Sequence, residues 1–158
     1  MEETGERFYY FSITTTGEAL APVFSAWSVE ALDRVVAEQG GGAELRDGLK
    51  WSYADSPYFD YRNDLFHEVN ELFEARPKMD YMMEDEAWKR EFDLRLEAME
   101  EAVVMLDSDG VFGSKTDRNE VMITVEIMPP DESNVQRAYR LNPPEAIEDW
   151  LREEWGIE

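Results

Sequence analysis

Two different hydrophobic periods in one chain restrict the fold more than any other feature of the sequence. Between Asn119 and Met128, apolar side chains occupy every second position from Val121 to Ile127, as on one face of a strand. From Glu84 to Leu106, apolar side chains recur every three or four residues, which is typical of a helix. The chain must therefore combine sheet and helix.

Shorter patterns predict elements near the N-terminus. The aromatic and β-branched run Phe8–Ile13 and the segment Ala19–Phe24 are expected to be strands joined by the turn residues Thr15–Glu18. Ser28 is a favourable N-cap for a helix that would end at Gly40–Gly42. The chain is thus expected to begin with a β-hairpin followed by a helix.

The remaining segments continue this order. We expect a short strand at Leu49–Tyr53, a helix at Asp60–Ala75 and a return strand at Val135–Leu141. Asn142 is expected to cap a final helix, with Pro143 at its first position. The apolar stripe of the expected helix Asp60–Ala75 would consist of Leu65, Val69, Leu72 and Phe73.

A hairpin at each end of the chain, in place of alternating βαβ units, favours an α+β fold. The prediction is a mainly antiparallel sheet covered by about four helices on one side. A chain of 158 residues has the usual length of one domain, so we expect a single α+β domain over residues 1–158. The acidic N-terminus and the absence of a long apolar run predict a cytoplasmic protein.

The charge is strongly one-sided. Asp and Glu total 37 against 15 Lys and Arg, which gives a formal charge of −22. Such a surface repels phosphate backbones and attracts cationic molecules, so no nucleic-acid partner is expected. A second explanation stays open, because acidic surfaces also keep proteins soluble in a salty cytoplasm.

No motif predicts a catalytic residue, a cofactor or a metal site. The chain has no Cys, and its single histidine, His67, is expected on the solvent side of its helix. The segment Asp107–Gly110 resembles part of a calcium loop, but Met105 and Thr116 would stand at ligand positions that need oxygen-rich side chains. The acids are too numerous for their spacing to select a catalytic pair.

Five tryptophans offer another kind of site. Trp88 and Trp150 fit the apolar stripes of helices, whereas Trp27, Trp51 and Trp155 are harder to place. An exposed tryptophan beside acidic residues would be a strong anchor for a protein partner.

Several segments together resemble the bacterial family known as domain of unknown function 4303. They span nearly the whole chain and are Phe8–Phe11, Leu49–Ser52, Leu106–Gly113 with the following Arg118, and Leu141–Pro143. The resemblance implies an α+β cytosolic bacterial protein, and similar small acidic families often contain immunity proteins that bind and neutralise toxins. It carries no catalytic residue onto this chain. Arg118 would pair with Asp107 or Asp109 and hold the turn at Gly110 and Gly113.

The sequence therefore predicts a binding protein, foremost an immunity protein that neutralises a toxin, with a basic protein as partner and no membrane partner. The alternatives are a regulatory or structural interaction protein and a carboxylate-based, metal-assisted enzyme. The residues expected to contact the partner are the acids of the two central helices, namely Asp64, Glu68, Glu71, Glu97 and Glu101.

Overall fold

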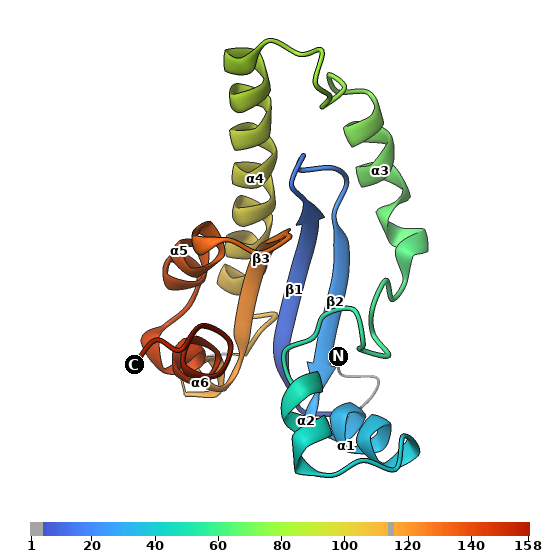
Figure 1. The fold of residues 1–158 in the computed structure, drawn as a ribbon, viewed down its shortest axis with the longest axis vertical. Coiled ribbons are helices and arrows are strands. Elements are labelled where there is room, and N and C mark those ends of the chain that lie inside the picture. Colours follow the sequence, from blue (N-terminus) through green and yellow to red (C-terminus); the bar gives the residue numbers. More distant parts are fainter. Residues whose placement is uncertain (1–4, 114–115) are drawn as a thin grey trace.

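The computed structural model describes residues 5–113 and 116–158 and shows a small sheet surrounded by helices (Figure 1). The strands are β1 (Phe8–Thr16), β2 (Val23–Ser28) and β3 (Met122–Met128). The α-helices are α1 (Val29–Glu38), α2 (Ala43–Leu49), α3 (His67–Glu74), α4 (Asp85–Ser108), α5 (Glu132–Leu141) and α6 (Pro144–Trp155). Two 3₁₀ helices, η1 (Asn63–Phe66) and η2 (Asp117–Glu120), complete the elements of the described residues.

The three strands lie in the order β2-β1-β3 and form a mixed sheet. The expected N-terminal hairpin is confirmed, because β1 and β2 pair antiparallel with Phe11 opposite Ala26, but its second strand is Val23–Ser28 and not Ala19–Phe24. β3 pairs with β1 in parallel, with Phe11 opposite Ile123. The α+β class is thus confirmed, but the mainly antiparallel sheet is wrong, because a long helical connection leads from β2 to β3 and β3 lies parallel to β1.

Helices cover both faces of the sheet, which corrects the prediction of about four helices on one side. On one face, Tyr10, Trp27 and Met122 pack in a core with residues of α1, α2 and α6. On the other face, Phe11 and Ile123 pack with residues of α4. The prediction of helices on one side fails because polar and apolar side chains alternate along β3, yet nearly all of them are buried. The face of β3 that carries the polar side chains is therefore covered as well.

The segment expected as a return strand is the helix α5, and its side chains cover the edge of β3. The amide of Asn134 donates to the carbonyl of Ile127 at 3.1 Å and accepts from its N–H at 2.9 Å. Asn142 pairs in the same way with Ile123, at 2.6 and 2.8 Å. Asn142 therefore does not cap α6, whose N-cap is Pro143. Side-chain amides here replace the backbone of a fourth strand.

The segment after α2 covers the edge of β2 and is not the expected short strand. Its residues form the end of α2 and a turn, from which the carbonyl of Ser52 accepts the indole N–H of Trp27 at 2.7 Å. Further along, the N–H of Asp60 donates to the carbonyl of Phe24 at 2.8 Å. Both sheet edges are thus paired with other parts of the chain.

The turn after α4 has the contacts that the sequence suggests. The Nε of Arg118 lies 2.8 Å from the Oδ1 of Asp107, and its Nη2 donates to the carbonyl of Leu141 at 2.9 Å. Gly110 and Gly113 have positive φ values of 78° and 97°, which glycine adopts at little cost. The predicted pairing of Arg118 with Asp107 is confirmed.

Candidate functional site

The five predicted contact acids are all exposed, and they lie in two rows on different helices. Asp64, Glu68 and Glu71 follow one another at helical spacing along η1 and α3. Glu97 and Glu101 form a second row, one turn apart on α4. In the view of Figure 1, α3 and α4 lie to either side of the β1–β2 hairpin, and Phe73 of α3 contacts Arg95 of α4. The structure therefore brings the acids together within each row but does not join the rows.

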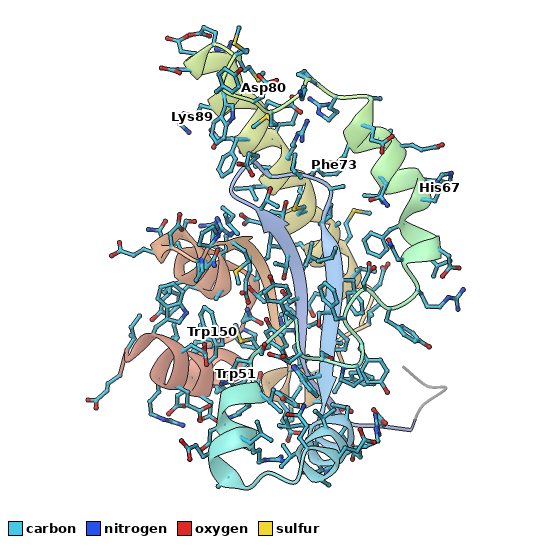
Figure 2. All side chains as sticks on the ribbon, turned by 45° about the vertical axis from the view of Figure 1, so that its right-hand side comes forward. Trp51, His67, Phe73, Asp80, Lys89 and Trp150 are labelled. Carbon is cyan, nitrogen blue, oxygen red and sulfur yellow. The ribbon has the colours of Figure 1, made fainter. Side chains whose placement is uncertain are left out.

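The helix α3 is attached to the protein through few side chains. Neither η1 nor α3 has a buried residue, and Leu65 and Leu72 are 65% and 67% exposed. The predicted core stripe is wrong for these two leucines, because Phe73 points inward to the guanidinium of Arg95, 5.3 Å from its ring centroid, and anchors the helix. Figure 2 shows Phe73 and His67 on different sides of α3. His67 is exposed, as the sequence predicts.

A buried ion network ties the neighbouring loop to α4. The Nε of Arg95 donates to Glu91 at 2.8 Å, while Arg76 donates to the same carboxylate at 2.6 Å. Arg95 also donates to the carbonyls of Ala19 and Pro77, at 3.2 and 2.8 Å. The hydrogen bond from Arg76, together with Arg95, lowers the pKa of Glu91 to about 2. This network is structural, and no motif marks it in the sequence.

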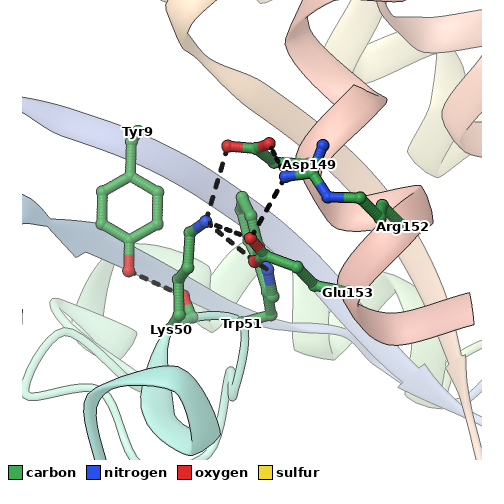
Figure 3. A network of polar contacts seen from close by, with 6 residues as sticks. All are labelled: Tyr9, Lys50, Trp51, Asp149, Arg152 and Glu153. Atoms are coloured by element: carbon green, nitrogen blue, oxygen red, sulfur yellow. Dashed lines mark hydrogen bonds and ion pairs between the residues drawn. The ribbon is translucent and has the colours of Figure 1, made fainter. Parts of the chain in front are cut away.

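A second polar network joins α2 to α6 (Figure 3). The ammonium of Lys50 lies 2.8 Å from Glu153 and 3.6 Å from Asp149. Trp51 donates its indole N–H to the same Glu153 at 2.8 Å, and Tyr9 donates to the backbone carbonyl of Lys50 at 2.6 Å. These contacts fix the ring of Trp51 between the two helices.

Trp51 forms one wall of a pocket of about 380 Å³, here called the aromatic pocket. It lies between the end of α2, the tip of β3 and α6, where Figure 2 shows Trp51 and Trp150 near one another. Among residues 5–113 and 116–158, no Lys or Arg lines it. Its aromatic and acidic lining residues are Trp51, Tyr53, Trp150, Trp155, Glu126 and Glu154.

Glu126 gives this pocket a buried carboxylate. The side chain belongs to β3, is only 8% exposed, and accepts a hydrogen bond from the hydroxyl of Tyr10 at 2.9 Å. Within the part of the chain that the structure describes, it makes no salt bridge. Burial raises the pKa of Glu126, and burial together with Glu153 raises the pKa of Glu154.

The polar face of the sheet continues beneath Glu126. Thr124, two residues earlier in β3, has a buried Oγ1 without a hydrogen-bond partner among the described residues. The hydroxyls of Ser12 and Thr14 lie 2.7 Å apart on β1 and are buried as well. The sequence shows these polar residues in alternation, but only the covering helices make them interior.

A larger pocket of about 540 Å³ lies on another side of the α2–α6 network and is lined by Tyr9, Lys50 and Asp149, among others. Its lining mixes the cations Arg46 and Lys50 with several acids, so it has no single charge preference. In the described ranges, no group of three or more His, Asp or Glu is placed to hold a metal ion. No helix in residues 5–113 or 116–158 has the length and apolar character of a membrane span.

Comparison with known proteins gives one match. No curated protein and no solved structure matches the chain. The model of the family described as domain of unknown function (DUF4303) matches residues 2–143, which include the whole sheet and the Arg118 turn. The chain therefore belongs to the DUF4303 family.

Proposed function

We propose that the protein is an acidic binding protein of the bacterial cytoplasm that neutralises a basic toxin by direct contact. The charge of −22 supports this function, because opposite fields accelerate encounter with a cationic protein. An inhibitor of this kind needs a complementary surface and no chemistry of its own.

The exposed side of η1 and α3 is the observation that carries the proposal. Leu65 and Leu72 project into solvent beside Asp64, Glu68 and Glu71. An apolar contact surrounded by a polar, solvent-accessible rim is a common arrangement of protein interfaces, and the charged rim steers the approach of the partner. Glu97 and Glu101 form a separate acidic row on α4, which would contribute to attracting the cationic partner.

Affinity capture with matched variants tests this proposal. The tagged protein is used to recover partners from its native host at about 0.1 M and about 1 M salt, where the Debye length falls from about 10 Å to about 3 Å. Two variants are run in parallel. Glu68→Lys/Glu71→Lys reverses the α3 row, and the control Glu38→Lys/Glu44→Lys makes the same charge change at exposed positions of α1 and α2.

The proposal expects one basic protein in near-equal amount, recovered by the wild type and by the control. High salt and the α3 variant should each reduce that recovery. If both variants recover the basic protein equally, the α3 surface is not the contact surface. If no basic protein is recovered at all, the proposed neutralisation of a basic toxin is contradicted.

A further inference from the structure

The aromatic pocket combines a buried carboxyl group with aromatic walls, and among the described residues no Lys or Arg lines it. We propose that it binds an organic cation, a guanidinium or alkylammonium group, with Glu126 at its floor and Glu154 at its wall.

The first step of the argument concerns Glu126. The Glu126 carboxyl group is 8% exposed, and within the described residues it accepts a hydrogen bond from the Tyr10 hydroxyl but makes no salt bridge, so it lacks the close opposite charge that a buried carboxylate needs. The charge of Arg137 on α5 acts on Glu126 without a salt bridge between them, since the Arg137 guanidinium donates to the carbonyl of Val125 at 2.8 Å and to the side chain of Asn134. A cation in the pocket would give Glu126 its missing partner.

The second step concerns the walls. Trp51, Trp150 and Trp155 present indole rings, which attract cations through their π faces and more strongly where water is excluded. Trp51 already makes such a contact, because the Nζ of Lys50 lies 4.7 Å from its ring centroid. Lys50 itself lines the neighbouring larger pocket and does not line the aromatic pocket.

The same lining argues against other ligands. A calcium ion takes six to eight oxygen ligands, and indole walls offer none. An anion would meet two carboxylates. A neutral apolar ligand would bury Glu126 further without pairing it. A compact organic cation satisfies both the charge and the aromatic surface.

This pocket is separate from the proposed toxin-binding surface. None of the five acids of α3 and α4 lines it, so the inference stands whether or not the partner is a toxin. The guanidinium or alkylammonium group can come from two sources. One is a free small cation, and the other is an Arg or Lys side chain of a partner protein.

The test titrates the purified protein with methylguanidinium and tetramethylammonium, and with methylurea and tert-butanol as neutral analogues of the same shapes. The readout is the set of tryptophan indole N–H signals in NMR spectra. The cations should shift the signals of Trp51, Trp150 and Trp155 with saturation, and the neutral analogues should not.

The variants Glu126→Gln and Glu154→Gln should each weaken cation binding about tenfold. Glu148→Gln, an equal change at an exposed position of α6 outside the pocket, should bind as the wild type does. If Glu126→Gln does not fold, Glu154→Gln and the cation-to-neutral comparison still decide the question.

A capped Gly-Arg-Gly peptide distinguishes the sources. Affinity at least tenfold above that of methylguanidinium indicates a partner's side chain, and equal affinity indicates a free cation. Cations that shift the tryptophan signals no more than the neutral analogues would overturn the proposal, as would full binding by both Gln variants.

Discussion

The side-chain amide of Asn134 pairs with both backbone groups of Ile127, as a neighbouring strand would. One residue of α5 thereby satisfies the donor and the acceptor that the edge of β3 presents at this point. Asn142 repeats the arrangement at Ile123, four residues earlier in the strand. At Ile123 and Ile127, the backbone groups on the edge of β3 are therefore already paired and are not offered to another molecule.

Replacing Asn134 by Asp tests this pairing with almost no change of shape. One carboxylate oxygen still accepts from the N–H of Ile127, but the other faces the carbonyl of Ile127 and repels it. We expect a loss of about 1–3 kcal/mol in the free energy of unfolding, measured in urea. The Ile127 amide should also exchange its hydrogen faster.

Gln136→Glu is the control for Asn134→Asp, because it adds the same charge at an exposed position of the same helix. It should leave stability within about 0.5 kcal/mol of the wild type. An equal effect of the two variants would show that charge, and not the lost donor, destabilises α5.

Glu91→Gln should destabilise the protein, because it leaves Arg95 and Arg76 without their shared carboxylate. The expected loss at neutral pH is about 3 kcal/mol. The pKa of Glu91 is lowered from 4.5 to about 2 by hydrogen bonding to Arg76 and Arg95. Its contribution to stability is therefore complete above pH 4.5 and declines as the pH falls toward 2.

Chemical denaturation at several pH values measures this dependence. The difference between the wild type and Glu91→Gln should narrow below pH 4.5, whereas the exposed Glu97→Gln on the same helix should show little difference at any pH. If the difference in unfolding free energy between the wild type and Glu91→Gln stays constant down to pH 2, the lowered pKa of Glu91 is contradicted.

Glu126→Gln should change the free energy of unfolding in the opposite direction from Glu91→Gln. It should stabilise the free protein at neutral pH. Burial raises the pKa of Glu126 above 4.5, so ionisation opposes folding as the pH rises through the folded-state pKa. Tyr10 on β1, Glu154 on α6 and Arg137 on α5 are the other ionisable groups that act on it. Gln keeps an acceptor for the Tyr10 hydroxyl and removes the charge.

Thermal melts should show the gain from Glu126→Gln at pH 7 and its disappearance below pH 4.5. Each kcal/mol recovered corresponds to about 2–4 °C in a domain of this size. A Tm that is lowered at pH 7 would mean that the carboxylate is already compensated by groups of the protein.

The sequence predicts the hairpin, the long helix, the N-cap at Ser28 and the Arg118–Asp107 pair, because each depends on local periodicity or local turn chemistry. Ser28 accepts from the N–H of Ala31 at 2.9 Å, as an N-cap should. These features need no knowledge of distant segments.

The failures lie where distant segments decide the outcome. Val135–Leu141 alternates well enough for a strand, but Asn134 and Asn142 at its ends bind the edge of β3 and fix a helix there. The sequence pattern predicts that Glu126 faces solvent, but in the structure α6 covers that face of the sheet. The aromatic pocket joins residues about 100 positions apart, which no spacing in the sequence brings together.

Growth rescue tests the proposed function most directly. The basic protein recovered by affinity capture is expressed alone in a bacterium and then together with this chain. The account predicts that it arrests growth alone, that the wild type and Glu38→Lys/Glu44→Lys restore growth, and that Glu68→Lys/Glu71→Lys does not. Normal growth with the partner alone, or equal rescue by both variants, would contradict neutralisation through the acidic side of α3.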